Sequence, residues 1–322
     1  MTLILSHISR QGVLQTVDRL VTTTKQGKVS PYDDQSNKSI IFAARDAVVT
    51  LAYTGLSYIG QTSTDQWITE TLQGEPVPLG PDGKSPATFS GRSRLDWPSL
   101  GEALTQLRDA VPSAMARVRP AWRKEPISIV VAGWQLYHRK PARPFVQIIH
   151  KLDVSGTVRV ETAPRHLGRG LYLSSEPDGH LTESELRQLL KTLAAQPIKN
   201  RMATLVGAVR KVASSSSLVG AHCMCTVLPP THLRWARVSY DSPTQAYGQL
   251  QSANAGIITM PVSFSPWVIS RGRTTAPMVQ AGSGTLELGL DHCTLTVESP
   301  KIDPPPGLVA YMGTQRRRPA PL

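Results

Sequence analysis

The order of extended and helical patterns is the feature that most constrains the fold. Residues 3–53 contain consecutive apolar extended runs joined by short turns, and residues 127–162 form a second such block. Helical patterns follow each block, at 57–122 and at 183–213, and 218–228 reads as a last strand. Each sheet needs a helix layer on one face and a partner on the other to bury its apolar side chains. The order therefore predicts an α+β fold, a four-layer αββα sandwich of two antiparallel sheets.

Local signals set several element boundaries. Thr182 and Glu185 form an S/T-x-x-E capping box, which predicts that a helix begins at 183. Residues 57–72 and 97–122 are each expected to form a helix, and Pro112 should kink or break the second one. The polar residues 25–37 are expected to form a loop.

A pair of prolines, Pro229 and Pro230, suggests a domain boundary. Residues 1–228 would form the αββα domain. Residues 229–303 read as a β-rich C-terminal extension with short strands at 233–240, 256–264, 267–270 and 285–297. Residues 304–322 are rich in proline, end in a basic cluster and are expected to be disordered.

The bulk composition fits a globular protein of 322 residues, with 40% hydrophobic and 18% charged residues. No run approaches the roughly 18 apolar residues that a membrane helix needs. The short apolar stretch at the start lacks a preceding basic region, so it does not resemble a signal peptide. We expect a cytoplasmic protein with no membrane partner.

The formal charge of +12 raises the question of nucleic-acid binding. The basic residues are spread along the chain, and no zinc-finger, helix-turn-helix or RNP-like motif accompanies them. A generally basic surface is therefore favoured over a nucleic-acid site, which remains a third possibility.

The chain has three cysteines, Cys223, Cys225 and Cys293. Their odd number argues against a disulfide framework. The first two alternate along an apolar strand and read as small buried hydrophobes. Neither these residues nor His232, Asp291 and His292 have the spacing of a ligand set, so we expect no metal and no cofactor.

The N-terminus carries the clearest chemical signal. Thr2 follows Met1, and its small side chain is compatible with removal of that methionine. A free N-terminal threonine combines a hydroxyl nucleophile with its own α-amine as base, because such an amine titrates near ~7.7–8.0. Met-Thr starts are common, so Thr2 needs support from other residues.

Three further residues supply that support. Asp18 ends an apolar strand in the string QTVDRLVT, Lys38 directly opens another strand, and Gly55 precedes the first helical pattern. With Thr2, they resemble the proteasome β-subunit family of N-terminal-nucleophile (Ntn) hydrolases. The nearest likeness is to the peptidase subunits of bacterial self-compartmentalised proteases, and it spans roughly residues 2–228.

The resemblance implies a role for each residue. Thr2 would be the nucleophile, and its amine the base. Lys38 would supply a positive charge beside it, Asp18 would hold Lys38, and the Gly55 N–H would donate to the oxyanion. The implied activity is that of a threonine-type peptidase acting on a peptide or protein substrate within a homo-oligomeric ring. A regulator or partner could bind through the C-terminal extension.

The sequence also departs from the family pattern. Arg169 stands where the family has serine in a Gly-Ser-Gly turn. The family also has an aspartate and then a serine near the end of its last core helix; Val212 or Ala213 stands at the acidic position, and the run 214–217 could supply the serine. Taken singly, Asp18 also reads as a turn residue paired with Arg19, and Lys38 as a solvated lysine. The alternative function is a catalytically inactive scaffold or binding protein of the same fold.

Overall fold

The computed structural model describes most of the first 230 residues and shorter segments beyond them. The described residues are 2–25, 28–33, 36–77, 89–91, 98–123, 125–137, 140–151, 158–162, 172–176, 180–230, 235–241, 247–252, 256–264, 266–270, 273–275, 279–281, 285–289 and 294–298. Within them the chain has a mixed α/β fold with several sheets and four α-helices.

The first large sheet has seven described strands, and all its neighbouring pairs are antiparallel. Strands from both ends of the sequence meet in it. Its order is β13 (Tyr172–Glu176), β1 (Ile4–Ser9), β2 (Gly12–Asp18), β14 (Cys223–Leu228), β15 (Trp235–Asp241), β21 (Thr285–Gly289) and β22 (Thr294–Glu298).

The second large sheet has eight described strands and is mixed. Its order is β12 (Val158–Thr162), β11 (Lys140–Lys151), β10 (Ile127–Tyr137), β6 (Ala47–Gly55), β5 (Ser39–Ala44), β18 (Trp267–Ser270), β19 (Arg273–Thr275) and β9 (Phe89–Gly91). The expectation of two antiparallel sheets is wrong here, because β18 pairs with β5 in parallel. A parallel pair needs a long crossover, and over 200 residues separate these two strands.

Four α-helices accompany the two sheets. They are α1 (Thr64–Gln73), α2 (Leu100–Ala116), α3 (Glu183–Ala195) and α4 (Ile198–Ala213), and a short 3₁₀ helix, η1 (Pro120–Trp122), follows α2. The predicted capping box at α3 is confirmed, because the Thr182 hydroxyl accepts from the Glu185 N–H and the Glu185 side chain accepts from the Thr182 N–H. Of the two outcomes expected at Pro112, a kink or a break, the break does not occur, because α2 runs through this residue.

Two short hairpins replace expected elements near the start of the chain. Part of the expected loop at 25–37 is strand β4 (Lys28–Asp33), which pairs with β3 (Val21–Lys25). The helix expected from residue 57 begins only at Thr64, because β7 (Tyr58–Ile59) and β8 (Thr62–Ser63) form a hairpin before it. Thr64 closes this hairpin by donating its N–H to the Ser57 carbonyl and its hydroxyl to the Leu56 carbonyl.

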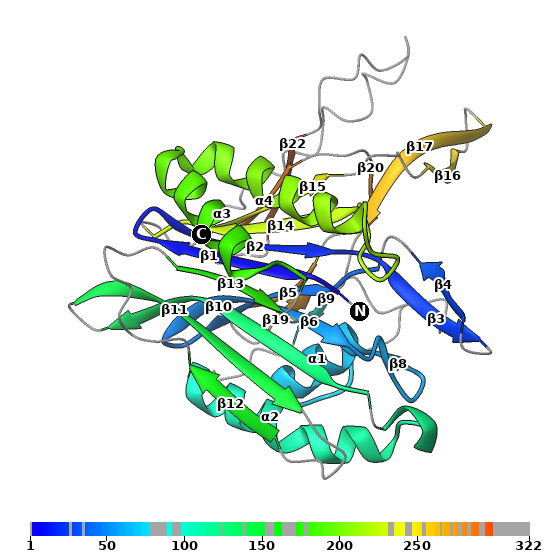
Figure 1. Ribbon diagram of the computed structural model, residues 1–322. Helices are drawn as coiled ribbons and strands as arrows, with labels where there is room; N and C mark the ends of the chain where they lie inside the picture. The colour runs from blue at the N-terminus through cyan, green and yellow to red at the C-terminus, as the bar shows by residue number, and fades with distance from the viewer. Residues whose placement is uncertain are drawn as a thin grey trace, which may run out of the picture.

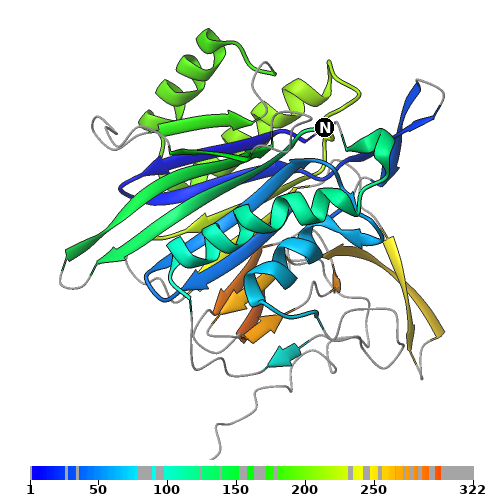
Figure 2. The ribbon, with the colours of Figure 1, turned by 90° about the horizontal axis from the view of Figure 1, so that it is seen from below.

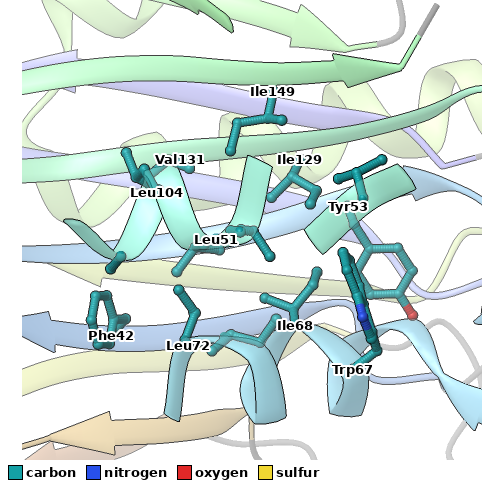
Figure 3. Close-up of a cluster of buried hydrophobic side chains, with 14 of the residues drawn as sticks. Phe42, Leu51, Tyr53, Trp67, Ile68, Leu72, Leu104, Ile129, Val131 and Ile149 are labelled. Atoms are coloured by element: carbon teal, nitrogen blue, oxygen red, sulfur yellow. The ribbon is translucent and has the colours of Figure 1, made fainter. Parts of the chain in front are cut away.

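Three clusters of buried apolar side chains relate the helices to the sheets. One joins α1 and α2 to the second sheet, as Trp67, Ile68 and Leu72 show against Leu51 and Tyr53 in Figure 3. Another joins α3 and α4 to strands β1, β2 and β14, and a third contains side chains from both sheets. In Figure 1 the pairs α3–α4 and α1–α2 lie on opposite sides of the strands, and Figure 2 shows α1 and α2 across β5, β6 and β10.

The described strands after Pro230 contribute to both large sheets. They add β15, β21 and β22 to the first and β18 and β19 to the second. A separate three-stranded sheet contains β16 (Tyr247–Ser252), β17 (Gly256–Phe264) and β20 (Val279–Ala281). Among the described helices, none has the length and apolar character of a membrane span.

Candidate active site

The structure brings Thr2 and Lys38 into direct contact. Thr2 lies just before β1 and Lys38 just before β5, and their side chains are 4% and 1% exposed. The Lys38 Nζ donates to Thr2 Oγ1 at 2.5 Å and also to the Leu20 carbonyl. A buried ammonium needs hydrogen-bond acceptors because it has lost its water. The solvated lysine considered from the sequence is therefore wrong.

Asp18, the last residue of β2, joins this group. Its Oδ2 accepts from the Leu3 N–H at 2.7 Å, and its Oδ1 accepts from the N–H groups of Leu20 and Gly220, each at 3.0 Å. Oδ1 also lies 3.7 Å from the Lys38 Nζ. Three backbone donors fix the carboxylate, which in turn compensates the buried charge of the lysine.

Opposing effects act on the Lys38 ammonium. Burial lowers the pKa of Lys38, and the nearby Arg19 lowers it further. The carboxylates of Asp18 and Asp33 oppose this shift by favouring the charged form. An ammonium in this setting releases its proton more readily than a solvated lysine, while Asp18 keeps the charged form accessible.

Thr54, which the sequence did not single out, contacts the candidate nucleophile directly. The Thr2 N–H donates to Thr54 Oγ1 at 3.0 Å, across 52 residues of sequence. Thr54 is buried in β6, immediately before Gly55. A threonine in a strand is too ordinary to have marked this contact in advance.

Gly55 occupies a position that only glycine fits. Its φ is +97°, and a Cβ built on it would lie 1.9 Å from the Pro126 carbonyl oxygen. The residue is next to Thr54, whose side chain holds the Thr2 backbone. A side chain at position 55 would therefore displace the chain beside the candidate nucleophile.

Gly220 is a second glycine that the sequence did not single out. A Cβ there would lie 2.6 Å from the Leu20 Cβ and 3.3 Å from Asp18 Oδ1. The absence of a side chain allows its N–H to reach the carboxylate. The contact spans 202 residues and involves the backbone, so it left no residue pattern to find.

The remaining expected positions contribute less to this group. Arg169 and Met1 lie outside the described residues. Val212 is buried among the apolar side chains beneath α3 and α4. The hydroxyls of Ser214 and Ser215 donate to the carbonyls of Lys211 and Val212, which ends α4.

Two cysteines of β14, Cys223 and Cys225, are buried. Cys223 and Cys225 are free thiols, and burial raises the pKa of Cys225 to about 12, although a hydrogen bond with Thr16 opposes the shift. Within the part of the chain that the structure describes, no three His, Cys, Asp or Glu side chains gather as metal ligands.

Comparisons with known proteins give a structural likeness only. No family model matches the chain, and neither does any curated protein. One similar structure is Anbu (ancestral beta-subunit) from Yersinia bercovieri, with 14% identity and a TM-score of 0.43, over 71% of this chain and 82% of that one. Another is a helical assembly of the Anbu complex from Pseudomonas aeruginosa, with 13% identity and a TM-score of 0.46, over 75% and 88%.

These matches correct the resemblance drawn from the sequence. The likeness to the proteasome β-subunit family, nearest to the peptidase subunits of bacterial self-compartmentalised proteases, is wrong. The similar structures are Anbu proteins, which are proteasome-like but form a distinct family. Four positions carried the resemblance, and so few residues do not define a family.

Proposed function

We propose that the chain is a threonine-type amidohydrolase that cleaves peptide bonds with Thr2 after Met1 is removed. The observation that carries this proposal is the 2.5 Å hydrogen bond from Lys38 Nζ to Thr2 Oγ1, inside a buried group that includes Asp18. A buried ammonium at a hydroxyl stabilises the alkoxide that forms when the hydroxyl attacks.

In the first step Thr2 Oγ1 attacks the carbonyl carbon of the scissile bond. Its proton passes to the α-amine of Thr2, which is neutral in part near neutral pH because its pKa is about 7.7–8.0. An oxygen–carbon bond forms, and the carbonyl electron pair becomes an oxyanion. We assign the Gly55 N–H as a donor to this oxyanion, while Lys38 faces Oγ1.

The tetrahedral intermediate then collapses. The carbon–nitrogen bond breaks, the leaving amine takes the proton from the Thr2 ammonium, and an ester joins the acyl group to Oγ1. Water attacks the ester carbonyl carbon and gives a proton to the same amine. The bond between that carbon and Oγ1 then breaks, Oγ1 takes the proton back from the amine, and the acid is released. Asp18 keeps Lys38 at Oγ1 throughout, and Thr54 Oγ1 provides an acceptor for the Thr2 nitrogen.

The proposal extends to architecture and assembly. The three apolar clusters support a four-layer αββα sandwich, because helix pairs cover each sheet and both sheets share a cluster. We also propose that the chain forms a homo-oligomer. Helical assembly is described for the Anbu complex from Pseudomonas aeruginosa, and here it is only a hypothesis.

Mass spectrometry with active-site labelling tests the chemistry. The intact mass should lack Met1, and a β-lactone or epoxyketone should add to Thr2. A Thr2→Ala variant should lose labelling and peptide hydrolysis, Thr2→Ser should keep part of both, and Thr192→Ala on α3 should keep both fully.

Equal hydrolysis by the wild type and Thr2→Ala would refute the nucleophile. Processed protein that neither labels nor hydrolyses peptides would favour the scaffold function instead.

A further inference from the structure

A second buried carboxylate accepts a hydrogen bond from Asn37, the residue before Lys38, and has no part in the proposed mechanism. Asp65, in the first turn of α1, is 7% exposed. Its Oδ2 accepts from the Trp267 Nε1–H at 2.7 Å and from the Asn37 Nδ2–H at 3.1 Å. Burial raises the pKa of Asp65, and the hydrogen bonds from Ser63, Trp267 and Asn37 oppose that shift. These donors hold the buried carboxylate in one orientation.

One of the two residues held by this carboxylate adjoins the candidate site. Asn37 directly precedes Lys38, and its backbone carbonyl accepts from the Tyr53 hydroxyl at 3.3 Å. Tyr53 in turn directly precedes Thr54, the acceptor of the Thr2 N–H. Asp65 thus fixes the side chain of Asn37, and Tyr53 fixes its backbone carbonyl. Asn37 and Tyr53 directly precede the two residues that contact Thr2, Lys38 and Thr54.

The other residue comes from the far end of the chain. Trp267 opens β18, is 2% exposed and pairs in register with Ile40, two residues after Lys38. Its bond to Asp65 spans 202 residues. The strand that flanks β5 on this side therefore carries the indole that holds the Asp65 carboxylate.

We propose that Trp267 and Asp65 are positioning residues for Lys38. The indole N–H fixes the Asp65 carboxylate, the carboxylate fixes Asn37, and Asn37 sets where the Lys38 side chain leaves the backbone toward Thr2 Oγ1. The C-terminal segment is then part of the active site's support. The link to catalysis rests on the proposed function, whereas the link to Lys38 does not.

Trp267→Phe in the full chain tests the proposal, because it removes the N–H donor and keeps an aromatic ring. Trp134→Phe is a matched control. Trp134 is also 2% exposed, and its Nε1–H donates to the Leu228 carbonyl at 3.0 Å, away from Asp65. Both variants lose one buried indole hydrogen bond, so general destabilisation should be comparable.

Two readouts separate positioning from stability. In the activity assay, Trp267→Phe should lower kcat at least tenfold with KM little changed, because small misplacements of catalytic groups reduce rates steeply. Trp134→Phe should leave kcat within about twofold. In ¹³C-lysine NMR, assigned with Lys38→Arg, the Lys38 titration should shift by at least half a pH unit in Trp267→Phe and stay unchanged in Trp134→Phe.

The NMR result does not require turnover. The same Lys38 titration midpoint in Trp267→Phe and Trp134→Phe would overturn the proposal. A shifted Lys38 titration in a protein whose Thr2 never labels would support positioning and refute the proposed function. If Trp267→Phe does not fold, Asp65→Asn is the substitute variant. The amide is isosteric with the carboxylate and weakens the hydrogen bonds from Trp267 and Asn37. An unchanged Lys38 titration in Asp65→Asn would overturn the proposal.

Discussion

Replacement of Asp18 by asparagine is the sharpest test of the buried charge arrangement. The carboxylate accepts three backbone N–H groups and lies 3.7 Å from the Lys38 Nζ. Asparagine has one acceptor oxygen, so at least one buried N–H faces the new amide NH₂ and loses its acceptor. That loss costs about 1–3 kcal/mol.

The effect on Lys38 adds a second and pH-dependent cost. Loss of one partner of a buried ion pair typically costs about 3–5 kcal/mol. Lys38 limits this cost by giving up its proton. At pH 8 the neutralisation of a lysine with the ordinary pKa of 10.5 costs about 3.4 kcal/mol, since one pKa unit corresponds to about 1.4 kcal/mol. The total expected for Asp18→Asn at pH 8 is roughly 4–6 kcal/mol.

The sign of the pH dependence follows from the lowered pKa. Between that lowered pKa and 10.5, the unfolded state binds a proton that the folded state lacks, so the free energy of unfolding rises with pH. The pKa of Lys38 should fall further in Asp18→Asn, because Asp18 is the strongest effect that raises it. The difference in the free energy of unfolding between the wild type and this variant should therefore shrink as pH rises from 7 towards 10.

A double-mutant cycle with Lys38→Met isolates the pair. Equilibrium urea unfolding at pH 7, 8 and 9.5 gives the free energies of the wild type, both single variants and the double variant. At pH 7 we expect the double variant to lose about 2–3 kcal/mol less unfolding free energy than the two single variants lose in sum, because methionine removes the uncompensated charge. Additive costs, or a deficit of Asp18→Asn that does not change with pH, would refute the reasoning.

Three further predictions concern single residues. Gly55→Ala should destabilise the fold by about 3 kcal/mol or more in urea unfolding, whereas Gly207→Ala, with nothing within 4 Å of its Cβ, should stabilise α4 by about 0.5–1 kcal/mol. At pH 8 a thiol with a pKa of about 12 is only about one part in ten thousand thiolate. Cys225 should thus resist a disulfide reagent in native Cys293→Ser protein and react once urea unfolds it; fast native labelling would contradict its burial. Thr54→Val should cost about 1–3 kcal/mol by removing the acceptor of a buried N–H, and a smaller loss in urea unfolding would show that another acceptor replaces it.

Local signals predicted the elements that local interactions determine. The start of α3 followed from Thr182 and Glu185, because a capping box is closed within four residues. Strands β17 and β18 also lie at their predicted positions, 256–264 and 267–270. The β3–β4 hairpin was missed because its second strand contains Pro31 and polar residues, which favour a loop when read alone.

The candidate site was predictable in its side chains and not in its support. Thr2, Asp18 and Lys38 were singled out because their order and spacing resemble the pattern of a known family, and the structure places these three side chains together. Thr54 and Gly220 were missed. One contributes an ordinary hydroxyl and the other only a backbone N–H, so neither residue type indicates its contact.

The parallel neighbour of β5 explains why the end of the chain was hardest to interpret. Residues 4–228 already supply each sheet with helices and partners, so the sequence pattern gave β18 no necessary place. Without β18, however, β5 would expose an unpaired edge beside Lys38, and an open edge is a site for pairing with other chains. The same short strand does both: its backbone covers that edge, and the Trp267 side chain holds Asp65. A four-residue strand can therefore matter more to the site than its length suggests.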